Sequence, residues 1–114
     1  MNTGAQGQDE LESMRDMFGA DFPMLAELYL RDSPPRVAAL QAAAEACDAV
    51  QAIKVVHTLG GSCASIGASG LANLCQAMEL ACRAGRQDNL ITQSQEIATE
   101  YARIDARLRT MLQA

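Results

Sequence analysis

Apolar residues recur every three or four positions along most of the chain, and no segment shows the sustained alternation of a half-buried strand. This periodicity, together with the abundance of Ala, Leu and Gln, predicts an all-α protein. The longest stripe follows Asp88, which we expect to cap the last helix. Its members are Leu90, Ile91, Ser94, Ile97, Ala98, Tyr101, Ile104, Leu108, Met111 and Leu112.

Residues that favour helix ends predict the boundaries of the first two helices. Residues 9–18 form a short amphipathic pattern, and Gly19 follows as a stop signal. Asp21 is the expected cap of the second helix, with Pro23 in its first turn, where a missing N–H does no harm. The preceding residues 1–8 are rich in Gly, Asn and Gln, so we predict a flexible tail.

Pro34 and Pro35 interrupt the second helical pattern, because proline cannot sit in an undisturbed helix interior. The chain either kinks here, or one helix ends and another starts with Ser33 as its cap. The apolar stripe resumes at Val37 and Leu40. We therefore favour one long kinked helix.

A third helix is expected from its cap at Asp48 to about Ile66. Gly67 then provides a stop and Ser69 a cap, which makes the connection to a fourth helix tight. Gly85 is the expected end of that fourth helix.

These short connections between long amphipathic helices predict an architecture. They place neighbours antiparallel, so we expect an antiparallel up-down four-helix bundle with the short additional N-terminal helix laid against it. A chain of 114 residues suits one domain, here residues 9–114.

Composition excludes several classes of partner. The net charge of −5 disfavours nucleic acid, because phosphate binding needs clustered Lys and Arg. No apolar run approaches the roughly 20 residues of a membrane span, and no signal-peptide pattern is present. We therefore expect a cytoplasmic protein that neither inserts into a membrane nor binds nucleic acid, with a monomer as the default.

The cysteines do not indicate a metal site. Cys47, Cys63, Cys75 and Cys82 form no CxxC pair, and a single histidine is available to join them. The last three lie on predicted core stripes, so we expect them to be buried, reduced thiols. No metal ligands are predicted.

That single histidine, His57, lies on the side of its helix opposite the apolar stripe, together with Lys54, Gly61 and Ala64. Gly60 and Gly61 are poor helix residues, each costing about 1 kcal/mol relative to alanine. Two glycines beside an exposed histidine indicate that something large approaches closely. The competing interpretation is a solvated histidine without a role, which is the commoner situation for a lone surface histidine.

Glu79 is the expected neighbour of His57. The two residues lie eleven positions on either side of Ala68, in the turn between the third and fourth helices. In an antiparallel hairpin this spacing places them at the same height, roughly 16 Å from the turn. A carboxylate that accepts a hydrogen bond from Nδ1 would fix the tautomer and leave Nε2 as the nucleophile.

Other uses of this histidine fit less well. A hydrolytic triad is disfavoured because there is no Gly-x-Ser-x-Gly motif and Ser62 lies toward the core side of the helix. A metal site needs more ligands, and haem would need an inward histidine. Covalent chemistry at an exposed imidazole remains, with a partner protein supplying the other reactive groups.

The residues 56–68 (VHTLGGSCASIGA), followed by LANLC at 71–75 and by Met78-Glu79, resemble the histidine-containing phosphotransfer (HPt) domain family. That family's pattern is a histidine, then Leu, Lys, Gly and Ser, then small residues ending in Gly-Ala. The short first helix, the Pro-interrupted second helix and the length of the bundle also match.

The resemblance implies roles for individual residues. His57 would be phosphorylated, Gly61 would let a receiver domain dock, Ser62 would be the motif serine, and Glu79 would be the polar neighbour of the imidazole. The domain would take a phosphoryl group from a receiver-domain aspartate and pass it to another receiver. It would be a phosphocarrier without turnover of its own. The resemblance implies response-regulator receivers and a hybrid sensor histidine kinase as partners, and no cofactor, because Mg²⁺ belongs to the receiver.

Gly60 is the one departure from the family pattern, which usually has lysine there to neutralise phosphoryl charge. Lys54, one turn away, or Arg83, on the next helix, could replace it in part. Alternatively, the domain is not phosphorylated and regulates a receiver or kinase by binding it. A ligand- or metal-binding helical bundle is a third hypothesis, which predicts a bound chromophore or metal after purification.

A docking surface is expected around His57 and includes the small or apolar side chains of Ile53 and Ala64. Met14 and Phe18 of the first helix would border it. Both also suit a second interpretation, in which they cap the bundle core.

Overall fold

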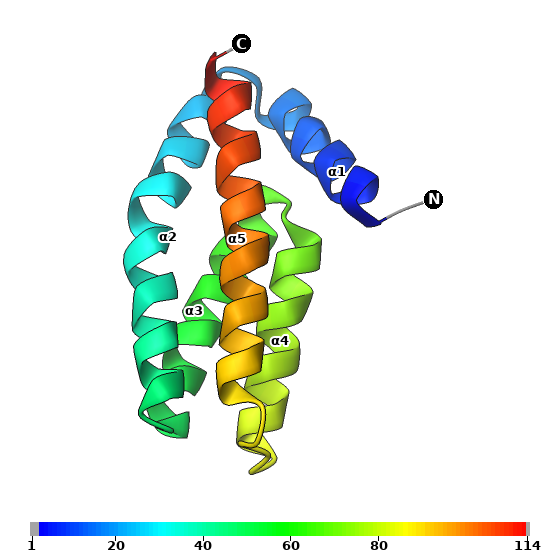
Figure 1. Ribbon diagram of the computed structural model, residues 1–114. Coiled ribbons are helices and arrows are strands. Elements are labelled where there is room, and N and C mark those ends of the chain that lie inside the picture. Colours follow the sequence, from blue (N-terminus) through cyan, green and yellow to red (C-terminus); the bar gives the residue numbers. More distant parts are fainter. Residues whose placement is uncertain (1–2, 114) are drawn as a thin grey trace.

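The computed structural model describes residues 3–113, and five α-helices account for nearly all of this part of the chain (Figure 1). They are α1 (Thr3–Phe18), α2 (Phe22–Glu45), α3 (Ala49–Ile66), α4 (Ser69–Arg83) and α5 (Leu90–Gln113), with a single 3-10 turn, η1 (Gly19–Asp21), between α1 and α2. Helices α2 to α5 run up and down as an antiparallel bundle, and α1 lies obliquely across one end of it. The predicted all-α four-helix architecture is confirmed.

The first helix begins at Thr3, six residues before the predicted start at Asp9. Gly4 and Gly7 suggested a tail, but Ala5 and the neighbouring glutamines are good helix formers. A helix that already exists downstream extends without a new nucleation penalty, so two glycines do not stop it. Residues 1 and 2 lie outside the described part, and the flexibility expected for residues 1–8 stays a prediction.

The second helix runs through Pro34 and Pro35 without a break, which confirms one long helix rather than two. Ser33 therefore caps nothing. It is buried inside the helix, and its hydroxyl has no hydrogen-bond partner. The prolines themselves are exposed, which keeps their rings out of the core.

Two predicted caps are wrong because an adjacent residue or turn takes their place. Asp21 precedes α2, but its side chain accepts no capping hydrogen bond. The turn η1 leads directly into the helix, and the Phe22 amide bonds to the Gly19 carbonyl. Asp88 lies one residue too early, because α5 begins at Leu90, directly after Asn89. Asparagine and aspartate cap helices about equally well, so the sequence did not separate them.

The turn between α3 and α4 is the tightest connection of the bundle. Asp48 caps the start of α3 as predicted, accepting a hydrogen bond from the Gln51 amide at 3.1 Å. Gly67 ends α3 in the left-handed region at φ +88°. Ser69 is not the cap of α4, because Ala68 occupies that position. Instead the Ser69 hydroxyl donates to Glu10 at 2.5 Å, which ties the turn to α1.

The core is a single cluster to which every α-helix contributes. Its largest fully buried side chains are Leu11, Phe22, Leu40, Val56, Leu59, Cys63, Leu71, Cys75, Met78, Leu90, Ile97 and Leu108. The predicted burial of Cys63, Cys75 and Cys82 is confirmed. Ile91 was expected in the last stripe but is 49% exposed. Neighbouring residues on a helix point about 100° apart, and Leu90 takes the inward position.

Within the described part of the chain, no helix is both long and apolar enough to cross a membrane.

We predict that Gly67→Ala lowers the free energy of unfolding by at least about 1–2 kcal/mol, the penalty of a side chain in the left-handed region. A Cβ there would also lie 2.5 Å from Cγ of Met14, so the Met14 side chain would have to move. Urea denaturation followed by circular dichroism measures the change. Gly70→Ala is the matched control, because nothing lies within 4 Å of its Cβ position. Equal stability of the two variants would contradict this account.

Candidate functional site

His57 stands in the middle of α3 and faces solvent, with 71% of its side chain exposed. The helix places it there because Val56 and Leu59 on either side of it are fully buried and fix the rotation of α3. The predicted outward orientation of the only histidine is confirmed.

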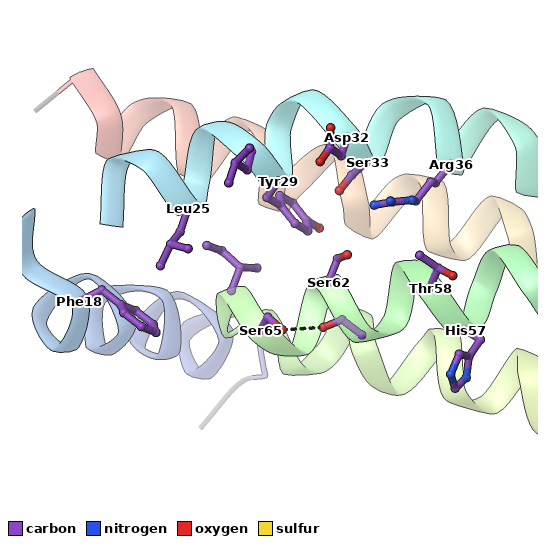
Figure 2. Close-up of a pocket in the computed structure, with 13 residues that line it drawn as sticks. Phe18, Leu25, Tyr29, Asp32, Ser33, Arg36, His57, Thr58, Ser62 and Ser65 are labelled. Carbon is purple, nitrogen blue, oxygen red and sulfur yellow. Dashed lines mark hydrogen bonds between the residues drawn. The ribbon is translucent and has the colours of Figure 1, made fainter. Parts of the chain in front are cut away.

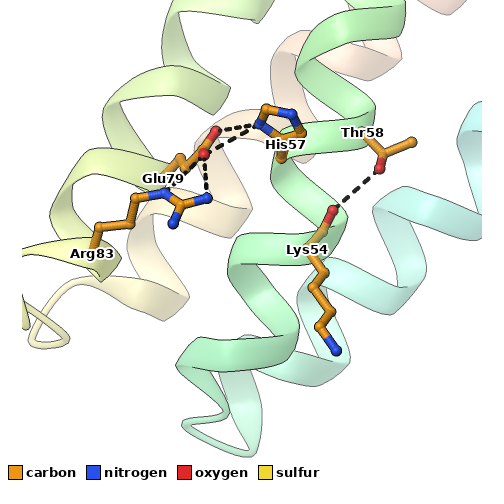
Figure 3. A network of polar contacts seen from close by, with 5 residues as sticks. All are labelled: Lys54, His57, Thr58, Glu79 and Arg83. Carbon is orange, nitrogen blue, oxygen red and sulfur yellow. Dashed lines mark hydrogen bonds and ion pairs between the residues drawn. The ribbon is translucent and has the colours of Figure 1, made fainter.

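The Nδ1 atom of His57 lies 3.1 Å from Oε1 and 3.2 Å from Oε2 of Glu79 on α4 (Figure 3). An ionised carboxylate only accepts hydrogen bonds, so this contact assigns the proton of the neutral ring to Nδ1. The Nε2 atom keeps its lone pair. The predicted pairing of these two residues across the hairpin is confirmed.

Arg83 completes the cluster one turn along α4 from Glu79. Its Nε and Nη2 atoms lie 3.0 and 2.9 Å from Oε2 of that carboxylate. Burial by itself would raise the pKa of the Glu79 carboxyl, but the hydrogen bonds from His57 and Arg83 outweigh it and hold the pKa below its ordinary value. Glu79 is therefore an anion at neutral pH.

Lys54 is placed differently from Arg83. It lies one turn before His57, and Figure 3 shows its side chain extending away from the imidazole. Its backbone carbonyl accepts a hydrogen bond from the Thr58 hydroxyl at 3.2 Å. Of the two cations that could replace the missing lysine, Arg83 is the one joined to the partner of the histidine.

The two glycines after His57 differ in what surrounds them. A Cβ at Gly61 would meet nothing within 4 Å, so this position leaves open surface beside the histidine, as predicted. A Cβ at Gly60 would lie only 3.1 Å from Cβ of Cys75. Gly60 therefore also allows the close packing of α3 on α4, because a rotation of 100° turns it toward that helix. That both glycines admit a partner stays a prediction.

Grooves open on both sides of His57. The larger one, of about 610 Å³, runs between α2 and α3 (Figure 2). It is lined by Phe18, Leu25, Leu28, Tyr29, Asp32, Ser33, Arg36, His57, Thr58, Gly61, Ser62, Ser65 and Ile66. The smaller one, of about 420 Å³, lies between α3 and α4, where Gly60, Ala64 and Ala72 leave little side-chain bulk and Asn73 and Gln76 are polar. Two residues, His57 and Gly61, line both grooves. Of these two, only His57 carries a reactive side chain.

Comparison with known proteins identifies the family. Residues 24–114 match the family described as the Hpt domain. The chain belongs to this family. Its structure is similar to the crystal structure of histidine-containing phosphotransfer protein B (HptB) from Pseudomonas aeruginosa PAO1, with a TM-score of 0.82 and 25% identity over 92% of this chain and 91% of that one. No curated protein sequence matches the chain.

The chain is thus a member of a family of histidine phosphotransfer proteins, which serve two-component phosphorelay signalling and are phosphocarriers rather than conventional enzymes. Within the described part of this Hpt domain, no three His, Cys, Asp or Glu side chains gather as they would around a metal ion.

The four residues predicted to border a docking surface separate into two pairs. Phe18 lines the α2–α3 groove, and Ala64 lines the α3–α4 groove. Ile53 and Met14 are half-buried and pack against the core, and Met14 also covers Gly67. For Met14, the structure favours the interpretation in which it caps the bundle.

Sequence reasoning missed the wall that α2 contributes to the larger groove. Leu25, Leu28 and Arg36 line it, and none was predicted. A signal for Arg36 was present, because the hairpin argument applied to the turn at Cys47 and Asp48 places Arg36 at the height of Leu59. The apolar pair gave no such signal, since both also fit an ordinary core stripe.

We predict that Glu79→Gln lowers the free energy of unfolding by about 0.5–1 kcal/mol near neutral pH, within the usual range for ion pairs at a protein surface. The folded-state pKa of Glu79 is depressed, so its contribution is present above the ordinary value of 4.5 and is lost as the pH falls through the folded-state value. Urea denaturation of both proteins over a pH series measures the difference.

Glu96→Gln, at an exposed carboxylate on α5, serves as the control for the loss of one negative charge. A difference between the native protein and Glu79→Gln that stays constant from about pH 3 to about pH 8 would contradict the assignment.

Proposed function

We propose that His57 carries the phosphoryl group of this Hpt domain, accepting it from a receiver-domain aspartate and passing it to another receiver. One observation supports this most strongly. The imidazole side chain is 71% exposed, and Glu79 holds its Nδ1 atom at 3.1 Å, so Nε2 is the ring nitrogen left for reaction.

The chemistry follows from that tautomer. The lone pair of Nε2 attacks phosphorus and forms the N–P bond, while the bond from phosphorus to the aspartyl oxygen breaks and its electrons return to the carboxylate. The proton stays on Nδ1, so the ring of His57 becomes a cation. The carboxylate of Glu79 then stabilises that positive charge through a charge-assisted hydrogen bond. The reverse attack by a second aspartate returns the ring to its neutral form.

The remaining requirements are positioning and charge neutralisation, which a docked partner supplies. The open surface at Gly61 admits the partner's backbone close to Nε2. The exposed Phe18 and Ala64, on the walls of the two grooves, extend the contact. The Mg²⁺ ion belongs to the receiver in this proposal, and the Hpt domain itself uses no cofactor.

The proposed donor is the receiver of a hybrid sensor histidine kinase, and the proposed acceptor is the receiver of a response regulator. We propose that the transfer takes place in the cytoplasm, with the Hpt domain as a monomer.

We expect that incubation with a phosphorylated receiver domain and Mg²⁺ places acid-labile, base-stable phosphate on the native protein. Mass spectrometry of the intact protein detects it. The same incubation of His57→Gln should give no label, because the nucleophile is gone. A native protein that binds the receiver and stays unlabelled would overturn the proposal.

Gly60 supports the second candidate function, regulation by binding alone. Gly60 occupies the position that usually holds lysine, and a Cβ there would lie 3.1 Å from Cβ of Cys75 on α4. The site therefore lacks the usual lysine, and the packing of α4 leaves little room for one. A domain of this kind would occupy the receiver without accepting phosphate.

The substitution Gly60→Lys separates the two functions, with Gly60→Ala to account for crowding against α4. For a phosphocarrier, we expect the lysine variant to be labelled a few-fold faster than the alanine variant, since it adds one partly screened charge near the phosphoryl group. Rapid-quench labelling measures both rates. Label that appears only after lysine is introduced would favour regulation by binding.

A further inference from the structure

Arg83, Glu79 and His57 form a chain of three side chains that starts on the surface of α4 and ends at the reactive ring (Figure 3). The Oε2 atom of Glu79 is shared within it. That oxygen lies 3.2 Å from Nδ1 of the histidine and receives two contacts from the guanidinium, at 3.0 and 2.9 Å. The arginine therefore acts on the same atom that faces the imidazole.

This arrangement restricts the carboxylate. A glutamate side chain has several rotatable bonds, and only a few of its rotamers bring the carboxylate to a histidine on another helix. A contact through two nitrogens of a planar guanidinium selects among those rotamers. Without Arg83, the contact with Nδ1 of His57 would be the one remaining restraint on the Glu79 carboxylate among the hydrogen bonds described above.

Charge gives a second reason. A phosphoryl dianion on Nε2 would lie near the negative charge of Glu79, and the usual lysine is replaced by Gly60. Lys54 extends away from the ring. Among the described residues, Arg83 is the cation in hydrogen-bond contact with this carboxylate, so it offsets the charge that would repel the phosphoryl group.

We infer that Arg83 is a positioning residue for phosphoryl transfer, which holds Glu79 so that the His57 ring keeps its proton on Nδ1 and offers Nε2. The inference rests on the proposed function only in taking Nε2 as the acceptor. The hold on the tautomer exists before any phosphate arrives and can be tested separately.

The first measurement is the tautomer of His57, from ¹⁵N resonances of its ring in the full chain at about pH 8.5, where imidazole is neutral. We expect the native protein to show a protonated Nδ1 and an unprotonated Nε2. In Arg83→Gln the two resonances should move toward the values of a tautomer mixture. Glu79→Gln serves as the reference for a ring that has lost its carboxylate.

The second measurement is the rate of phosphorylation by phosphoramidate, which needs no partner protein. Nε2 forms the bond to phosphorus, the P–N bond of the reagent breaks, and ammonia leaves. We expect Arg83→Gln to react roughly three- to tenfold more slowly, as for a charge-assisted contact partly screened by solvent. Arg83→Lys should recover part of the rate, because the charge is kept while the two-nitrogen contact is lost.

The chain provides a matched control in Arg109, which pairs with Asp105 on α5 at 2.7 Å in the same i,i+4 arrangement. The two arginines are exposed to nearly the same extent, at 57% and 56%. Each partner carboxylate also faces an aromatic ring residue, Tyr101 for Asp105 and His57 for Glu79. Arg109→Gln should therefore lose similar stability but leave the His57 ring and its rate unchanged.

Equal rates and identical ring resonances in Arg83→Gln and Arg109→Gln would overturn the inference. A native protein that phosphoramidate does not label at His57 would instead count against the proposed function. In that case, the ¹⁵N measurement still decides whether Arg83 sets the tautomer.

Discussion

The close approach of α3 and α4 is the constraint on which the site depends. Gly60 lets the two helices come together, since a Cβ in its place would lie 3.1 Å from Cys75. The tight turn at Gly67 fixes how the helices align along their length. Glu79 reaches His57 only because both conditions hold, and a slip of one residue would move the carboxylate by about 1.5 Å along the axis and turn it by about 100°.

Much of this geometry was predictable, because it depends on counting residues from a turn. The turn at Gly67 and Ala68 marks the midpoint of the hairpin, and equal spacing from Ala68 pairs His57 with Glu79. The α3 helix was equally accessible, since its cap at Asp48 and its apolar stripe agree. For α3, the local capping signal and the tertiary packing favour the same helix. Prediction from sequence succeeds where the two agree.

The parts that could not be predicted are those decided by a neighbouring helix or by near-equal local choices. Gly60 and Gly61 look identical in sequence, and only the position of α4 makes one a packing residue and the other open surface. The cap of α5 was a choice between aspartate and asparagine, which cap helices about equally well, and the start of α2 was decided by the turn η1. To predict which α2 residues line the larger groove, one must know how α2 is rotated relative to α3. An apolar stripe defines that rotation only roughly, because the stripe covers a broad face of the helix.

The two grooves beside His57 differ in character. The lining of one includes the apolar side chains of Phe18, Leu25 and Leu28, and the lining of the other includes several small residues together with Asn73 and Gln76. A protein that covers the imidazole, from either groove, prevents any other protein from reaching it. Yet a substitution that alters the wall of one groove leaves the opposite wall as it was. If two receivers use His57 as proposed, they cannot bind it at the same time, although the sequence of each groove can change separately.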